Sequence, residues 1–121
     1  MPAIVLDIDG TVLDGTKVIG NAAKTIPKIL GEKKLPFLVL TNDGGMAEAS
    51  KAKSINAKFG MENGGFEAKN IHLSSSFFAN PEYVEKYKDK WVLANGANLP
   101  SEIIKILYGY GYKKVVSVYE L

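Results

Sequence analysis

Four residues near the start of the chain have the clearest capacity for chemistry: Asp7, Asp9, Gly10 and Thr11. Residues two apart in a strand point to the same face, so the two carboxylates should project together. Carboxylates this close repel each other unless a cation lies between them, and Mg²⁺ prefers oxygen ligands and suits phosphate chemistry. One carboxylate can then attack phosphorus while the other transfers the leaving-group proton. Gly10 would let the backbone approach a phosphate, and Thr11 offers a hydroxyl group.

A simpler interpretation of the same tract is that Asp9-Gly10 only turns the chain after a strand, with Asp7 as the polar strand end. A second polar tract, Thr41-Asn42-Asp43-Gly44-Gly45, follows another apolar run. A hydroxyl, an amide and glycine N–H groups at a helix N-terminus are typical of an anion site. The alternative for this tract is a strand-to-helix loop with an ordinary N-cap. Together the two tracts favour a phosphate site.

The elements that must position these tracts alternate along the chain. Short apolar runs predict strands near residues 3–8, 36–40, 91–94 and 114–118, and residues 11–19 suggest a small hairpin. Helical patterns cover residues 21–30 with a stop at Gly31, 46–59, 74–88 with a break at Asn80-Pro81, and 100–108. Strands alternating with helices predict an α/β fold with a parallel sheet, whose ligands bind at the carboxyl ends of the strands.

The composition narrows the classes of function. The chain has 121 residues, of which 46% are hydrophobic and 23% charged, as in ordinary globular proteins. A net charge of +2 is too small to indicate binding to nucleic acid or to an anionic membrane surface. Cysteine is absent, which excludes disulfides and thiolate metal sites and agrees with a reducing compartment. All fifteen basic residues are lysines; Lys51, Lys53 and Lys58 are assigned to the solvated face of a helix, and Trp91 to the core.

The two polar tracts resemble the first two motifs of the haloacid dehalogenase superfamily, Asp-x-Asp-Gly-Thr and Thr-Asn, each after a buried strand. Residues 36–45, with Glu48 and Lys51, resemble its NagD-like, 4-nitrophenylphosphatase branch, and residues 87–96 and 110–113 are similar to the group named after the cat eye syndrome critical region protein. The resemblance implies a three-layer α/β/α Rossmann-like core and a Mg²⁺-dependent phosphohydrolase acting on a small phosphomonoester.

The resemblance also implies a role for each matching residue. Asp7 would be the nucleophile that forms a phospho-aspartyl intermediate, and Asp9 the general acid and base. The carboxylate of Asp7 and the backbone carbonyl of Asp9 would hold Mg²⁺. Thr41 and Asn42 would bind the phosphoryl group, with further contacts from Gly10, Thr11, Asp43 and Gly44. The acid at Asp43 departs from the branch, which has Asn or Gly there, and the alternative for it is to point away as a helix cap.

Two motifs of that superfamily have no match here: a lysine that neutralises the nucleophile and phosphate, and an acid that completes the metal shell. We therefore expect residues 1–121 to be the N-terminal part of the core, without the cap domain and only weakly active. A non-catalytic module that binds phosphate or a partner is the alternative. We also expect the first strand to be an exposed edge that self-associates or pairs with a C-terminal half. The expected compartment is the cytoplasm or the mitochondrion.

Overall fold

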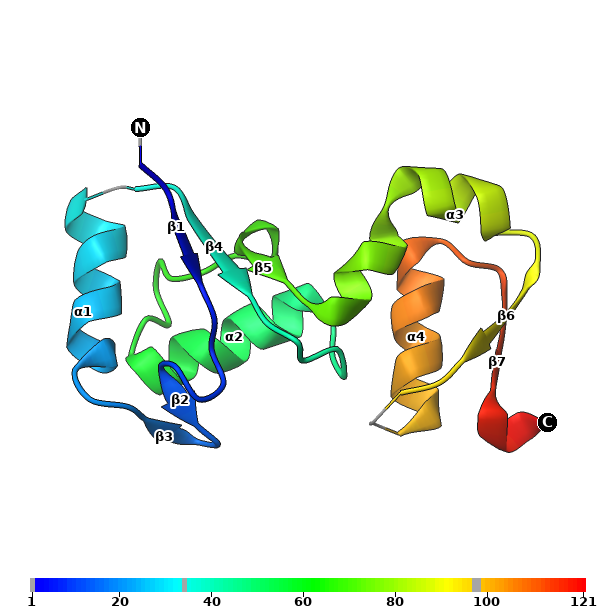
Figure 1. Ribbon diagram of the computed structural model, residues 1–121, viewed down its shortest axis with the longest axis horizontal. Helices are drawn as coiled ribbons and strands as arrows, with labels where there is room; N and C mark the ends of the chain where they lie inside the picture. The colour runs from blue at the N-terminus through cyan, green and yellow to red at the C-terminus, as the bar shows by residue number, and fades with distance from the viewer. Residues whose placement is uncertain (1, 34, 97–98) are drawn as a thin grey trace. The chain divides into compact units, whose positions relative to one another are not determined.

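The computed structural model describes residues 2–33, 35–96 and 99–121 (Figure 1). These residues divide into two compact units. The first unit comprises the chain up to Asn42 together with Glu48–His72, and the second comprises Asp43–Ala47 and Leu73–Leu121. The sequence pattern did not indicate this division, because it contains no recognisable linker.

The first unit is built on a three-stranded parallel sheet. Its strands are β1 (Ile4–Leu6), β4 (Phe37–Leu40) and β5 (Ile71–His72), in the order β1-β4-β5. The first two strands match the predicted apolar runs, whereas β5 has only two residues and was not predicted. Among the described strands, β1 lies at the edge of the sheet, as expected.

The predicted hairpin follows β1 and is confirmed. Its strands, β2 (Leu13–Asp14) and β3 (Lys17–Val18), pair in antiparallel fashion. The turn between them contains Gly15, whose φ of 58° is a conformation that glycine adopts without strain. Leu13 is buried at the base of the hairpin. The hairpin is therefore anchored in the core next to the acidic tract.

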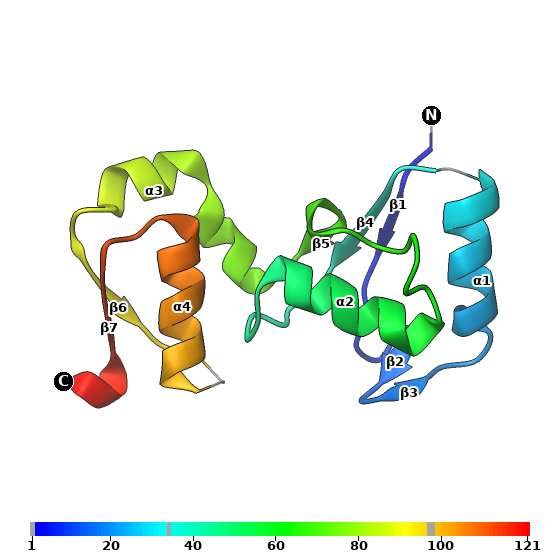
Figure 2. The same ribbon diagram turned by 180° about the vertical axis from the view of Figure 1, so that it is seen from behind.

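Two helices accompany the sheet of the first unit. Helix α1 (Ala22–Lys28) continues as a π-helical segment, η1 (Ile29–Lys33). The predicted stop at Gly31 is therefore wrong; Pro27 removes a backbone donor, and a wider turn follows it. Helix α2 (Glu48–Phe59) lies across one face of the sheet (Figure 2) and buries Ala52, Ile55 and Phe59. The chain then forms a 3₁₀ turn, η2 (Ala68–Asn70), before β5.

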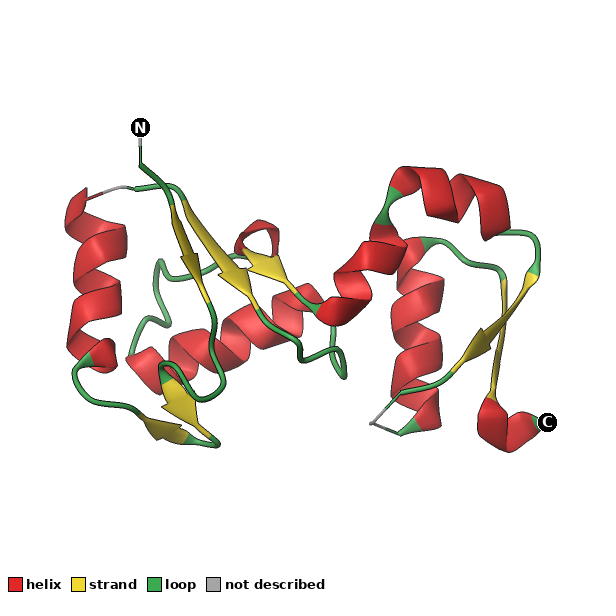
Figure 3. Ribbon diagram, in the orientation of Figure 1, coloured by secondary structure: helices red, strands yellow, loops and turns green. Residues whose placement is uncertain are grey.

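The second unit contains the remaining elements (Figure 3). They are η3 (Ser74–Ala79), α3 (Pro81–Tyr87), β6 (Trp91–Ala94), α4 (Pro100–Tyr110), β7 (Lys114–Ser117) and η4 (Val118–Glu120). The break at Asn80-Pro81 is confirmed: the Asn80 side chain accepts a hydrogen bond from the N–H of Glu82 and caps α3. Helix α4 runs two residues beyond the prediction to Tyr110, and Gly111, whose φ is 107°, follows it as the C-cap.

Strands β6 and β7 pair in parallel with each other and form a sheet of their own. The four predicted strands are thus present, but the described residues distribute them between two parallel sheets. The core of the second unit contains Ala94, Leu107, Tyr112 and Val115. Trp91, which we assigned to the core, is 72% exposed, so that assignment is wrong. Within the described ranges, no helix has the length and apolarity that crossing a membrane requires.

Candidate active site

The acidic tract begins where β1 ends. The strand stops at Leu6, and the next three residues alternate in burial: Asp7 and Asp9 are exposed, while Ile8 between them is completely buried. This alternation is the one that strand geometry predicts for residues two apart. Burial of Ile8 anchors the tract in the core, so the two carboxylates are carried on a fixed piece of backbone.

A tight turn follows the second acid. The N–H groups of Thr11, Val12 and Leu13 all point to the carbonyl oxygen of Ile8, at 3.2, 3.0 and 3.0 Å. Gly10 has a φ of 79°, and its own N–H donates to the carbonyl of Leu13 at 2.7 Å. This N–H is therefore already hydrogen-bonded within the turn. The predicted approach of a phosphate to Gly10 would then depend on the space that glycine leaves by having no side chain, and not on its N–H.

Each aspartate accepts a hydrogen bond from a different threonine. The Thr11 hydroxyl donates to Asp7 Oδ2 at 3.2 Å, from within the same turn. Thr41, which is buried at the end of β4, donates from Oγ1 to Asp9 Oδ2 at 3.4 Å, and its N–H bonds the carbonyl of His72 in β5 at 3.0 Å. The structure therefore brings together the ends of the neighbouring strands β1 and β4, as the parallel topology predicts.

Lys51 also reaches this cluster, which the sequence analysis missed. We assigned it to the solvated face of α2, but it is only 7% exposed, and its Nζ lies 3.9 Å from Asp9 Oδ2. Lys51 precedes Ile55 by four residues and Phe59 by eight. It therefore lies on the same stripe of the helix as these buried residues. This helical spacing is the feature of the sequence from which the burial of Lys51 could have been predicted. Lys53 is exposed, as expected.

The rest of the second tract is arranged differently from the prediction. Asn42 is exposed directly after Thr41. Asp43 and Gly44 belong to the second unit, where the carbonyl of Asp43 accepts the N–H of Ser74 at 3.1 Å. The Asp43 carboxylate accepts the N–H of Gly45 at 3.1 Å, a local turn of a kind common for aspartate. Because α2 begins only at Glu48, Asp43 is not its cap, and the glycines precede its first turn.

The donor set at β1 fits Mg²⁺. Proteins commonly hold this ion with one or two carboxylates, while water and phosphate oxygens complete the shell, and Asp7 and Asp9 supply two exposed carboxylates. A closed cage of protein ligands is not formed, since no three histidine, cysteine or acidic side chains gather anywhere in the described part of the chain. The ammonium of Lys51 offsets the charge of Asp9, so Asp7 is the carboxylate more open to a further cation.

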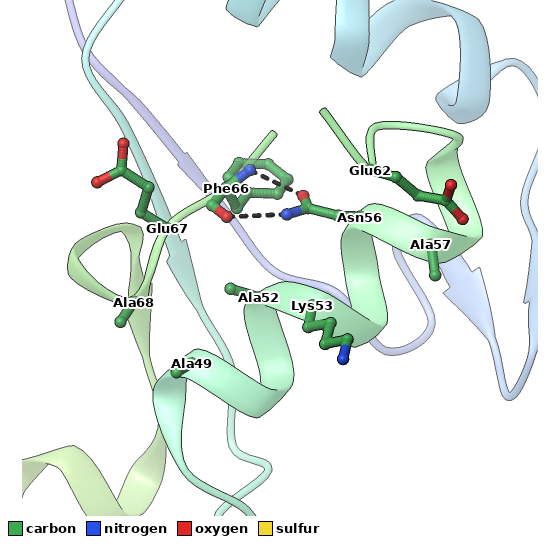
Figure 4. A pocket seen from close by; sticks show the side chains of 9 residues that line it. All are labelled: Ala49, Ala52, Lys53, Asn56, Ala57, Glu62, Phe66, Glu67 and Ala68. Atoms are coloured by element: carbon green, nitrogen blue, oxygen red, sulfur yellow. Dashed lines mark hydrogen bonds between the residues drawn. The ribbon is translucent and has the colours of Figure 1, made fainter. Parts of the chain in front are cut away.

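A surface pocket of about 410 Å³ lies elsewhere on the first unit, along α2 and the loop that leads to η2 (Figure 4). Three alanines of the pocket wall, Ala49, Ala52 and Ala57, come from the helix. Asn56 spans the pocket edge through two hydrogen bonds to the backbone of Phe66. Neither the acidic tract nor Thr41 contributes to the lining. The pocket is therefore separate from the cluster around the two aspartates.

Solved structures share this fold. The chain superimposes on a hypothetical protein from Pyrococcus horikoshii with a TM-score of 0.68 and 23% identity, covering 99% of this chain and 42% of that one. It superimposes on NagD from E. coli K-12 with a TM-score of 0.62 and 19% identity, covering 95% of this chain and 45% of NagD. At these identities the likeness shows the fold alone: a mixed α/β structure with parallel strands, matching part of the NagD-like architecture.

Two yeast proteins are related in sequence. A mitochondrial hydrolase of Saccharomyces cerevisiae is 31% identical over 114 residues, which is 94% of this chain and 29% of the hydrolase. A cardiolipin synthase/mitochondrial hydrolase fusion protein of Schizosaccharomyces pombe is 28% identical over 115 residues, covering 91% of this chain and 17% of the fusion. The chain thus spans less than a third of these relatives.

Residues 4–113 match the family profile described as haloacid dehalogenase-like hydrolase. The chain belongs to the haloacid dehalogenase-like hydrolases, as its first two motifs predicted.

Proposed function

We propose that this site transfers a phosphoryl group from a small phosphomonoester to the carboxylate of Asp7 and then hydrolyses the product. The observation that supports this most directly is the unequal environment of the two acids. Asp9 Oδ2 faces both the Thr41 hydroxyl and the Lys51 ammonium, whereas Asp7 Oδ2 accepts the Thr11 hydroxyl. Two neighbouring carboxylates in different surroundings are suited to different roles, one as nucleophile and one as proton carrier.

In the first step, an oxygen of the Asp7 carboxylate attacks phosphorus, and the bond from phosphorus to the leaving-group oxygen breaks. Asp9 in its acid form gives its proton to that oxygen, and the alcohol departs. In the second step, Asp9 takes a proton from water while the water oxygen attacks the same phosphorus. The bond to Asp7 breaks and inorganic phosphate leaves. The net reaction is hydrolysis of a phosphomonoester to an alcohol and phosphate.

The remaining residues of the two tracts would bind and orient the phosphate. Thr41 and Asn42 follow β4 and offer a hydroxyl and an amide, and we propose that both contact the phosphoryl oxygens. The Asp7 carboxylate and the Asp9 backbone carbonyl would hold Mg²⁺, which neutralises negative charge on the phosphate when it is bound. Further contacts from Gly10, Thr11, Asp43 and Gly44 remain predictions from the sequence.

The test is to look for the covalent intermediate directly, because turnover by the chain is expected to be slow. Removing one electrostatic stabiliser typically costs about 10²–10³ in rate. The chain would be incubated with Mg²⁺ and 4-nitrophenyl phosphate, quenched in acid, digested and analysed by mass spectrometry. We expect one phosphoryl group on the peptide that contains Asp7, removable by hydroxylamine as an acyl phosphate is. Asp7→Asn should abolish it, whereas Asp14→Asn, an exposed acid in the adjacent hairpin, should not.

A phosphoryl group that persists in Asp7→Asn, or none in the unaltered chain, would reject the proposal. If inorganic phosphate nevertheless binds the chain and shifts the NMR signals of Thr41 and Asn42, the alternative is favoured: a module that binds phosphate without catalysis. A robust steady-state rate that depends on Mg²⁺ and on Asp7 would instead show that these 121 residues suffice for full activity.

A further inference from the structure

We propose that Lys51 is a positioning residue that sets the charge balance between the two aspartates, an inference that rests on the proposed function. Its Nζ lies 3.9 Å from Asp9 Oδ2, on the oxygen to which the Thr41 hydroxyl also donates. The two donors come from different elements, α2 and the end of β4. Together they restrict rotation of the Asp9 carboxylate and keep it in a defined orientation beside Asp7.

The position of Lys51 costs free energy that a residue with a purely packing role would not need to spend. The side chain is 9% exposed, so its ammonium has lost most of its hydration and needs negative charge nearby. It is also the fourth residue of α2, close to the helix N-terminus, where the backbone dipole disfavours a cation. An apolar side chain would avoid both costs. The pairing with Asp9 contributes to offsetting these costs.

The consequence for the site follows from charge. Without Lys51, a phosphate dianion would meet two adjacent carboxylates, and both would also attract a divalent cation. With Lys51 in place, the negative charge of the ionised Asp9 carboxylate is partly offset, whereas Asp7 keeps its own. Lys51 should therefore weaken the binding of a cation and strengthen the binding of an anion at the same site. A residue with a purely structural role has no reason to move these two affinities in opposite directions.

The experiment measures the two affinities separately on the 121-residue chain, with NMR titration of Mg²⁺ alone and of inorganic phosphate at saturating Mg²⁺. Lys51→Met removes the charge at similar length. We expect Mg²⁺ to bind about five- to tenfold more tightly and phosphate about five- to tenfold more weakly, the effect of one charge on a nearby divalent ion screened as in water. Lys51→Arg should restore both affinities. The matched control is Lys53→Met, an exposed lysine of the same helix, which should change neither.

The circular dichroism spectrum and the unfolding midpoint show whether each variant folds, and Lys51→Gln replaces Lys51→Met if the latter does not. The inference is overturned if neutral variants weaken both ligands, if they leave both affinities unchanged, if Lys53→Met has the same effect, or if the unaltered chain binds neither ligand. Opposite shifts without an Asp7 acyl phosphate would reject only the proposed reaction. Normal formation of the acyl phosphate with unmoved affinities would reject only the role of Lys51.

Discussion

Replacing Asn56 by alanine should destabilise the first unit, because its side chain ties a loop to α2. Its Nδ2 donates to the carbonyl of Phe66 at 2.8 Å, and its Oδ1 accepts the N–H of Phe66 at 2.8 Å. Phe66 is buried, and its ring lies 5.2 Å from that of Phe37 in β4. The pair of hydrogen bonds therefore holds the loop before η2 where the Phe66 ring packs against the sheet.

The magnitude follows from the groups left without partners. Each buried backbone group that loses its hydrogen bond costs about 1–3 kcal/mol, so two of them set an upper limit of about 6 kcal/mol. Asn56 and Phe66 both line the surface pocket, where water can reach the freed groups. We therefore expect Asn56→Ala to lower the free energy of unfolding by about 2 kcal/mol, near the lower end of that range. With an m-value of about 1 kcal/mol/M for so small a unit, the urea midpoint would fall by about 2 M.

The assay has to distinguish the two units. Trp91 and all six tyrosines lie in the second unit, so their fluorescence reports its unfolding, whereas far-ultraviolet circular dichroism reports the helices of both. We expect the circular dichroism transition to shift in Asn56→Ala more than the fluorescence transition does. Hydrogen exchange provides a local measurement: the amide of Phe66 should lose its protection from exchange in the variant.

The control is Lys53→Ala, which removes an exposed side chain of the same pocket and the same helix. Its unfolding free energy should stay within about 0.5 kcal/mol of the unaltered chain. If the midpoint of Asn56→Ala is no lower than that of Lys53→Ala, the hydrogen bonds do not hold the loop and the reasoning fails.

Three further predictions concern other parts of the chain. Burial raises the pKa of Tyr112, whose hydroxyl donates to the carbonyl of Phe78 at 2.9 Å. The free energy of unfolding should therefore be unaffected below the ordinary tyrosine pKa of about 10 and fall as the pH rises above it. Urea titrations at several pH values should show that Tyr112→Phe removes this pH dependence. Gly111→Ala should lower the free energy of unfolding of the second unit, followed by fluorescence, by about 1 kcal/mol, because a residue with a Cβ is strained in a left-handed conformation. The φ of Gly111 is 107°, and a Cβ would lie 3.2 Å from Val84 Cγ1. We also propose that the chain self-associates along the edge of β1; Val5→Lys, at an exposed position of that strand, should then make it monomeric in size-exclusion chromatography with light scattering.

Much of the local structure was predictable because it depends on neighbouring residues. Apolar runs ending in turn residues located β1 and β4, and Asn80-Pro81 located the start of α3. The break at that dipeptide has a local cause, since proline lacks an N–H and asparagine caps the helix that follows. The convergence of Asp9 and Thr41 was predictable for the same kind of reason, because parallel strands bring their carboxyl ends to one edge of the sheet.

The features that sequence reasoning missed depend on contacts between distant residues. Strand β5 has two residues, too few for a periodic pattern, and is defined by its pairing with β4. Trp91 begins a strand, but the sheet of β6 and β7 leaves that side chain exposed, and the strand pattern alone does not say which face is covered. The division into two units likewise leaves no mark in composition.

Lys51 was wrongly predicted to be solvent-exposed because the prediction followed its residue type and not its position in the helical repeat. Lysine is rarely buried, and on a helix with several lysines a solvated face is the ordinary expectation. Yet position 51 falls on the apolar stripe of α2, and a helix that packs against a sheet buries that stripe whatever residue it carries. A charge on such a stripe must find a partner, and the nearest strand ends carry carboxylates. The combination of helical spacing and an acidic strand end therefore predicts an internal ion pair, and in this chain it joins α2 to Asp9.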